Sequence, residues 1–381
     1  MKKFLLYFVL VLCLILNIKH EAFSYDSYNV LEKSQTGLVE KVEYADNQDI
    51  SLNNCTPGVK QIVTVKILSG EFKNEVVTIN NMLTGNPAYD IITKKGDKVV
   101  LHQETDNDLN EFFISDIQRA PFMLVLVGTF ALLLIIVGKK KGLFSLLSIF
   151  ITCILILSCL TPMILSRVNP IFGTVVICLI STAITMYLVG GFNRKSTSAF
   201  LGTFLSIICA LILSVMTVNF AHITGFSNES CTFLFSAHPE LNLQQIAISA
   251  IMLATLGAVM DIAMSVSSAI NEFFVINNVL SVKELFKSGM NVGKDIIGTM
   301  ANTLILVYLG GALPMVLLSE SIDFQKFFNL NQIVTEISAA LIGSITLLIC
   351  VPVTAIISAV LIKMKKSNES DIMIENKENI L

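Results

Sequence analysis

Long apolar runs constrain this chain more than any other feature. Between residues 120 and 363 the sequence consists of seven apolar segments, each long enough to cross a bilayer as a helix. Of the 381 residues, 54% are hydrophobic and only 14% are charged, whereas a soluble domain has about 25% charged residues. The sequence predicts an α-helical polytopic membrane bundle of about seven spans, at 120–138, 142–161, 168–191, 198–220, 245–268, 297–318 and 338–362.

The basic residues predict how this bundle is oriented. Alternate connections and the C-terminal tail together hold eleven Lys and Arg residues, whereas the other connections hold only Arg167 and Lys326. Basic loops stay on the cytoplasmic side of a membrane. With an odd number of spans, the C-terminus is then inside and the segment before the first span is outside. The eleven residues are Lys139, Lys140, Lys141, Arg194, Lys195, Lys283, Lys287, Lys294, Lys363, Lys365 and Lys366.

The first residues have the pattern of a secretory signal. Lys2 and Lys3 precede an apolar run at 4–16, and small residues follow at Ala22 and Ser24. A charged start, a short apolar core and small residues two apart predict a signal peptide at 1–24. An uncleaved anchor helix is the alternative, but the run is shorter than the roughly 20 residues that a span needs.

The polar segment at 25–117 predicts a small extracytoplasmic all-β domain. Short runs rich in β-branched residues, at 61–68, 75–79 and 98–102, are bounded by Gly, Asn and Asp, which is typical of about five strands. No nucleophile with a base and an orienting group can be identified in it, so we expect a binding or packing module and not an enzyme.

The rest of the chain divides into a transmembrane helical domain at 118–366 and a polar cytoplasmic tail at 367–381. The formal net charge of −3 argues against a nucleic-acid partner, which would require a basic face.

Ionisable and small polar residues within the spans are the candidates for function, because a charge in lipid costs several kcal/mol unless it has a partner or lines a cavity. In the fifth span these residues share one helix face, and a similar face follows in the sixth span. Asp261 and Asn302 are each predicted about five residues from the cytoplasmic end of their helix, which is a depth of about 7 Å, so we expect them to be within contact distance. A solute path and a structural helix–helix contact both remain open. The candidate residues are Gly257, Asp261, Ser265, Asp295, Gly298 and Asn302.

The connection at 270–296 differs from the other loops. Ser281 and Glu284 have the spacing of a capping box, which predicts a short cytoplasmic helix at 281–288 that Gly289 ends. Asn291 is then the predicted cap of the helix that leads into the sixth span.

The remaining polar residues are weaker candidates. Glu336 precedes the apolar run of the last span, which predicts a place at the outer interface. One outer loop contains residue types that bind metals, but their spacing matches no established site. We therefore predict no metal site, no cofactor and no catalytic residues. The residues of that loop are His222, Glu229, Cys231, His238 and Glu240.

Three runs occur in the fifth and sixth spans and the connection between them: Gly257-Ala-Val-Met-Asp261-Ile-Ala-Met-Ser265, then Asn271-Glu272, then Ser288-Gly-Met-Asn-Val-Gly-Lys-Asp295-Ile-Ile-Gly-Thr-Met-Ala-Asn302-Thr-Leu. Together they are similar to the signature region of the YibE/F-like multipass membrane proteins. The resemblance extends over 120–363, and the preceding β segment also fits. It implies a permease-like protein of the bacterial cytoplasmic membrane, and it supplies no substrate and no residue roles.

These observations lead to one main hypothesis and one alternative. The main hypothesis is a transporter or permease for a small solute or ion, whose path runs between the fifth and sixth spans along Asp261 and Asn302. The sequence has no GxxxxGK[ST] motif, so drive by ATP requires a partner such as an ATPase subunit or a related permease. The alternative is a membrane sensor or scaffold whose outer β domain binds a ligand or a partner.

Overall fold

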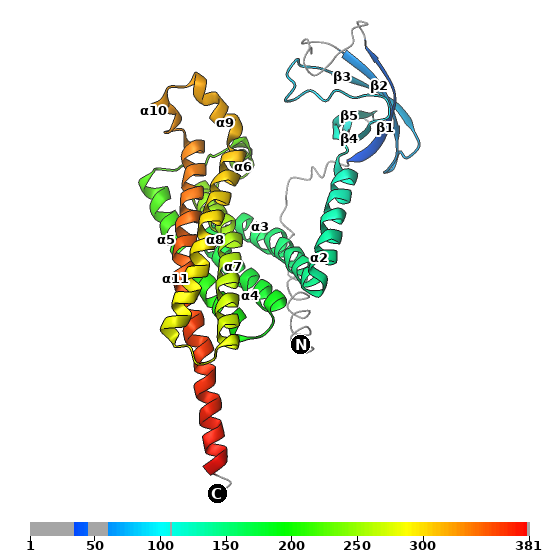
Figure 1. Ribbon diagram of the computed structural model, residues 1–381. Helices are drawn as coiled ribbons and strands as arrows, with labels where there is room; N and C mark the ends of the chain where they lie inside the picture. Colours follow the sequence, from blue (N-terminus) through cyan, green and yellow to red (C-terminus); the bar gives the residue numbers. More distant parts are fainter. Residues whose placement is uncertain (1–33, 45–59, 107–108, 379–381) are drawn as a thin grey trace. The chain divides into compact units, whose positions relative to one another are not determined.

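The computed structural model (Figure 1) describes residues 34–44, 60–106 and 109–378. The predicted signal peptide at 1–24 lies outside these ranges. The chain forms two compact units, which divide between Leu133 and Leu134 within one long helix. Each unit has a hydrophobic core of its own.

The first unit contains a five-stranded antiparallel sheet with strand order β3-β2-β1-β4-β5. Its side chains alternate between core and surface, so that Val63, Val65 and Ile67 of β2 are all fully buried. This alternation is what a half-buried strand requires. The predicted all-β domain of about five strands is confirmed, with strands β1 (Gln35–Tyr44), β2 (Lys60–Ile67), β3 (Val76–Met82), β4 (Lys98–Asp106) and β5 (Leu109–Ile117).

Helices make up the rest of the described chain, and six of them are long and apolar enough to cross a membrane. The predicted helical membrane bundle is thereby confirmed. The helices and turns in chain order are α2 (Ala120–Leu155), η1 (Ile156–Leu160), α3 (Thr161–Leu165), α4 (Pro170–Gly190), α5 (Arg194–Phe220), α6 (Glu229–Ala237), α7 (Leu243–Ile276), α8 (Val282–Gly311), α9 (Leu313–Leu317), η2 (Leu318–Ser321), α10 (Phe324–Phe327) and α11 (Asn331–Glu378).

The first of these six helices contains both the first and the second predicted span, at 120–138 and 142–161. It covers Ala120–Leu165, 46 residues, which at about 1.5 Å per residue is about 69 Å and more than twice the apolar thickness of a bilayer. The helix breaks at Lys139, where φ is 49° and ψ is −127°. A Cβ atom at Gly142 would overlap the carbonyl oxygen of Leu134, although residues eight apart in a straight helix are about 12 Å apart. The chain therefore turns sharply between the two predicted segments, and glycine permits the close approach.

Small residues bring α5, α7, α8 and α11 close together in the core of the helical unit. A Cβ atom at Gly202 of α5 would overlap Thr354 of α11, and one at Gly293 of α8 would overlap Val351 of the same helix. Ser198 of α5 and Ser267 of α7 share a hydrogen bond with an Oγ–Oγ distance of 2.6 Å. Small side chains and interhelical hydroxyl bonds are the usual means of helix association in membranes.

Basic residues from different connections meet at one end of this bundle. Arg194 donates from Nη1 to the carbonyl oxygen of Leu361 over 2.6 Å, and Lys363 donates from Nζ to the carbonyl oxygen of Leu280 over 2.7 Å. At the other end, the side chain of Asn331 links the start of α11 to the loop between α5 and α6.

The connection before α8 differs from the prediction. The capping box is present, since Ser281 accepts from the backbone of Glu284 and the Glu284 carboxylate accepts from the backbone of Ser281. However, α8 continues without a break through Gly289 and Asn291 to Gly311. The predicted stop at Gly289 is wrong because that glycine packs against Ile270 of α7, where a Cβ atom would overlap the isoleucine side chain.

The C-terminal part also contains more helix than expected. The last span is followed without interruption by helical backbone to Glu378, so most of the segment predicted as a polar tail, 367–381, continues α11.

Candidate functional site

The relative register of α7 and α8 can be determined from two contacts. Ile270 of α7 meets Gly289 of α8, and Thr255 and Leu304 both lie against Gly343 of α11, with 3.6 and 3.4 Å from their side chains to the position of a Cβ atom there. The two helices run in opposite directions. Thr255 lies fifteen residues before Ile270 on α7, and Leu304 lies fifteen residues after Gly289 on α8, so the two contacts indicate the same register.

This register places the six candidate residues in the same region of the two helices. Nine residues from the Ile270–Gly289 contact, Asp261 is level with Gly298. Gly257 is then level with Asn302, and Ser265 lies close to the level of Asp295. The six residues cover about 12 Å along α7 and about 10 Å along α8, and we call them the α7–α8 band. Asp261 and Asn302, which were predicted at equal depth, are thus offset by four residues, or about 6 Å along the helices.

All six residues of the α7–α8 band are exposed on this chain. At Gly257 and Gly298, an added Cβ atom would have no atom within 4 Å, so the helix surface is open there. Neither Asp261 nor Asn302 makes a hydrogen bond or ion pair with another side chain in the described part of the protein. The expected contact between Asp261 and Asn302 is therefore not formed within the chain.

The band also lies deeper along its helices than predicted. The prediction ended the fifth span at residue 268, but α7 continues to Ile276, and α8 begins at Val282. Asp261 and Gly298 are consequently near the midpoints of their helices. Hydropathy does not reveal this extension, because the polar residues at the end of α7 and the start of α8 are helical although they are not apolar.

One signal in the sequence identifies which side of α8 faces inward. Gly289 and Gly293 form a Gly-x-x-x-Gly pair, and both glycines are buried against neighbouring helices. Such pairs are typical of close helix contacts in membranes. Asn291, Asp295 and Asn302 lie on the opposite face of α8, so the packing of the glycines turns these polar residues outward.

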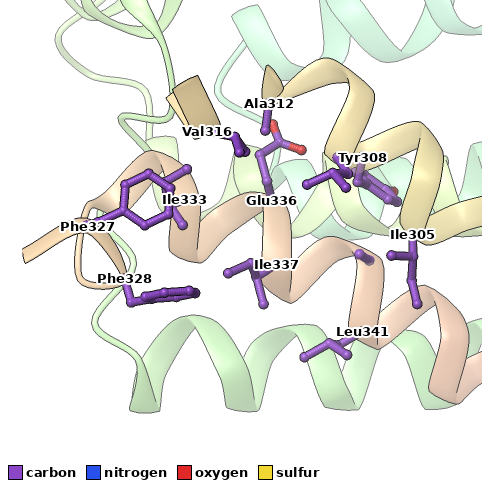
Figure 2. Close-up of a pocket in the computed structure, with 12 residues that line it drawn as sticks. Ile305, Tyr308, Ala312, Val316, Phe327, Phe328, Ile333, Glu336, Ile337 and Leu341 are labelled. Atoms are coloured by element: carbon purple, nitrogen blue, oxygen red, sulfur yellow. The ribbon is translucent and has the colours of Figure 1, made fainter. Parts of the chain in front are cut away.

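A second feature, which the sequence analysis did not identify, is a cavity of about 320 Å³ at the end of the bundle opposite the basic residues. Figure 2 shows the residues that line it, which come from the end of α8, from α9, from the α10 turn and from the start of α11. We call this cavity the outer chamber. It is lined by Ile305, Tyr308, Leu309, Ala312, Val316, Phe327, Phe328, Ile333, Glu336, Ile337, Ala340 and Leu341.

The outer chamber exists because α8 ends at Gly311. Pro314 has no backbone N–H and cannot continue a helix from the preceding turn, so the chain forms the short α9 instead. Asp323 then caps α10 by accepting from the backbone of Gln325 and Lys326, which brings Phe327 and Phe328 back to the start of α11. The sequence prediction had extended the sixth span through Pro314 to residue 318 and so did not predict the chamber.

Glu336 is the one carboxylate in this lining. Figure 2 shows its side chain extending from α11 toward the turn at Ala312, with Tyr308 on one side and Phe327 and Phe328 on the other. Phe327 is almost fully buried, whereas Phe328 is 45% exposed. Glu336 therefore lies against a cavity in the structure, in addition to being near the end of its span as predicted.

The outer loop that contains His222, Glu229, Cys231, His238 and Glu240 was considered in the sequence because these residue types bind metals. In the described part of the chain, no three His, Cys, Asp or Glu side chains are close enough together to hold a metal ion. His238 and Glu240 are paired, with Nδ1 and Oε1 3.5 Å apart. A backbone hydrogen bond lowers the pKa of the Glu240 carboxyl, and His238 and Arg167 act in the same direction.

The fold and these features define a class, a multipass membrane protein with an N-terminal β domain. The family described as "YibE/F-like protein" matches residues 126–364, and the one described as "YibE/F family N-terminal domain" matches residues 29–117. The chain therefore belongs to the YibE/F-like family, in agreement with the resemblance of its signature region. No curated protein and no solved structure matches it.

Proposed function

We propose that this protein is a permease that moves a small solute or ion, and that the path of the solute follows the α7–α8 band. The observation that supports the proposal is the exposure of Asp261 near the midpoint of a membrane helix. A carboxylate at the centre of a spanning helix costs about 3 kcal/mol in lipid. Such a residue persists where water, a solute or another protein chain covers it.

The composition of the band suits a polar solute. Asp261 and Asp295 offer carboxylate oxygens, and Ser265 and Asn302 offer groups that donate and accept hydrogen bonds. Gly257 and Gly298 leave the backbone accessible, with open space where a side chain would be. A hydrated cation or a polar solute with donor groups is the substrate class that these groups favour.

The exposure of the band also argues for a partner. A path needs walls on all sides, and the α7–α8 band is open on the side away from the bundle. We infer that another membrane chain, such as a related permease subunit, completes the path. Since the sequence has no ATP-binding loop motif, an ATP-driven mechanism would also require an ATPase subunit.

The proposed location is the bacterial cytoplasmic membrane, with the β domain outside and the C-terminus inside. The basic asymmetry of the sequence supports this orientation, and the meeting of Arg194 and Lys363 at one end of the bundle is consistent with it.

Access of water to the band provides the direct test. Gly298→Cys introduces a thiol in open space, and Leu348→Cys introduces one on α11 at a similar level, where the side chain is 50% exposed and apolar. In native membranes we expect a hydrophilic methanethiosulfonate reagent to label Gly298→Cys well above the parent chain, and Leu348→Cys no more than the parent. Equal labelling of the two variants would mean that the band faces lipid, and the proposed path would be wrong.

A second candidate function is sensing through the β domain. Three large side chains on and after β3 are strongly exposed, Val76 at 55%, Met82 at 64% and Tyr89 at 72%, and each offers apolar area for contact with a partner. The two functions differ in their response to Asp261→Asn, which removes a charge at the band. Transport predicts a folded, inserted protein without activity, whereas sensing through the β domain predicts a normal phenotype in a deletion strain.

A further inference from the structure

We propose that a second copy of this chain covers the exposed side of α8, so that the protein is a two-fold symmetric dimer. The proposal rests on the proposed function in one respect, since it names the chain that completes the path along the α7–α8 band. The charges that lead to it are independent of transport, because a charged helix face within a membrane needs cover whether or not a solute moves.

Charged residues of α8 lie at the level of the membrane centre. A Cβ atom at Gly293 would overlap Val351 of α11, so Lys294 and Asp295, which follow Gly293 closely, are near the level of Val351. That level is the middle of the apolar segment 338–362 of α11. A lysine and an aspartate exposed to lipid at this depth are both strongly unfavourable, so this side of α8 does not face lipid.

Basic and acidic side chains occupy opposite sides of the exposed face of α8. At about 100° per residue, Lys283, Lys287 and Lys294 point within about 40° of one another, and all three are exposed. We call these three lysines the basic row. Asp295 is exposed about 100° further around the helix than Lys294, and Gly298 lies between the two directions. The exposed face is therefore divided lengthwise by charge.

The two sides of this face adjoin different helices. Ile305 is about five full turns beyond Lys287, so both point in the same direction from the helix axis, and Ile305 lines the outer chamber together with residues of α11. The basic row is thus on the α11 side. Because α8 packs against both α11 and α7, the other side, with Asp295, adjoins α7. The exposed residues Asp261 and Glu272 of α7 add to that acidic side.

These charges are not neutralised within the chain. Glu272 and Lys287 are each two residues from the Ile270–Gly289 contact, which places them at the same level of the two helices. Neither side chain makes an ion pair or a hydrogen bond with any residue that the structure describes, and the same is true of the rest of the basic row and of Asp295. Charges within a membrane that have no partner in their own chain indicate partners on another one.

A second copy has the complementary arrangement of charge. A two-fold axis along the membrane normal keeps every residue at its own level and turns the basic side of each copy toward the acidic side of the other. Lys294 of one copy is then level with Asp295 of the other, and Lys287 is level with Glu272. Each pair forms twice in such an isologous contact. Gly298, where a side chain is replaced by open space, leaves room between the copies for the path.

The experiment exchanges charges between two copies. Lys287→Glu and Glu272→Lys are made in separate full-length chains that carry different fluorescent protein fusions, and subunits are counted by single-molecule photobleaching in dilute liposomes. We expect the parent chain to be a dimer. Each variant alone places like charges together at two symmetric positions, so its dimer dissociation constant should rise by about tenfold or more. When the two variants are co-expressed, they should form a mixed dimer as stable as the parent, because both of its contacts join opposite charges.

The mixed dimer also excludes two trivial explanations. Neither variant chain contains both changes, so recovery cannot come from an ion pair within one chain, and a chain that failed to fold would not be restored by its partner. Glu320→Lys and Lys326→Glu are the matched controls, since both residues are exposed on the short elements between α8 and α11. Neither change should affect the dimer.

The proposal is overturned if the parent chain is a monomer, or if both single variants dimerise like the parent. It is also overturned if the mixed pair dimerises no better than the single variants. Labelling of Gly298→Cys separates this result from the proposed function. A dimer in which Gly298→Cys is labelled no more than Leu348→Cys supports this proposal and contradicts the path, whereas a monomer in which Gly298→Cys is labelled contradicts the dimer and supports the path.

Discussion

The unfolding free energy of an Asp261→Leu variant distinguishes a hydrated α7–α8 band from one that faces lipid. On a helix surface in contact with lipid, an aspartate near the centre of a span is unfavourable by about 2.5–3.5 kcal/mol, while a leucine is favourable by about 0.3–0.6 kcal/mol. Asp261 is exposed near the midpoint of α7 and has no partner side chain in the described part of the protein. If lipid covered this position, Asp261→Leu would stabilise the folded protein by about 3–4 kcal/mol.

Under the proposed function, the gain should be far smaller. A carboxylate in a water-filled path is already solvated, so its removal relieves little, and we expect the unfolding free energy of Asp261→Leu to change by less than about 1 kcal/mol. Transport should be lost in the same variant, as in Asp261→Asn. Leu348→Asp is the reciprocal control, because Leu348 is apolar, 50% exposed and at a similar level on α11, and it should destabilise the protein by about 3–4 kcal/mol.

The assay is reversible unfolding of the reconstituted chain, combined with complementation of a deletion strain. A gain of about 3 kcal/mol in Asp261→Leu together with a wild-type phenotype would show that the band faces lipid and has no role in transport. In that case the site assignment fails, whatever the protein transports. A small energetic change with loss of function supports the assignment.

Three further predictions concern local structure and orientation. Ser281→Ala removes the cap of α8 and should lower the protection of the first turns from hydrogen exchange by about 1 kcal/mol, while unchanged protection would contradict the capping argument. Gly293→Ala should destabilise the bundle by about 1–3 kcal/mol because its methyl group overlaps Val351. Gly298→Ala fills open space and should stabilise α8 by up to about 1 kcal/mol. Equal unfolding free energies of the two variants would refute the packing described. An alkaline phosphatase fusion after Asp106 should be active and one after Lys366 inactive, and the reverse pattern would invert the proposed topology.

The elements that sequence predicts well are those determined by local chemistry. The apolar runs locate the membrane helices, because their backbone must be satisfied within each segment. The capping box at Ser281 was predictable for the same reason, since both of its hydrogen bonds are formed within four residues. Strand β2 likewise follows from its β-branched residues, which alternate between surface and core.

Features that depend on packing between helices were not predictable from local pattern. Gly289 has the local character of a helix stop, but the fit against Ile270 keeps it inside α8. The polar face of α7 and α8 could be read from residue spacing. Its direction does not follow from hydropathy, because a lipid-facing side and a core-facing side of a membrane helix are equally apolar, and for α8 the Gly289 and Gly293 pair is the signal that indicates it. The outer chamber requires four separate elements to meet, and Glu336 alone in the sequence gives no indication of the aromatic residues beside it.

The outer chamber and the α7–α8 band share one face of α8 and differ in their level along it. Gly298 and Ile305 are seven residues apart, as are Asn302 and Leu309, which separates the members of each pair by about 10 Å along the helix and by only about 20° around it. Ile305 and Leu309 line the chamber, whereas Gly298 and Asn302 are exposed in the band. About two turns of helix therefore separate the two features. Because of this distance, the loss of charge in Glu336→Gln should leave labelling of Gly298→Cys unchanged, and a changed labelling would show that the two features are coupled.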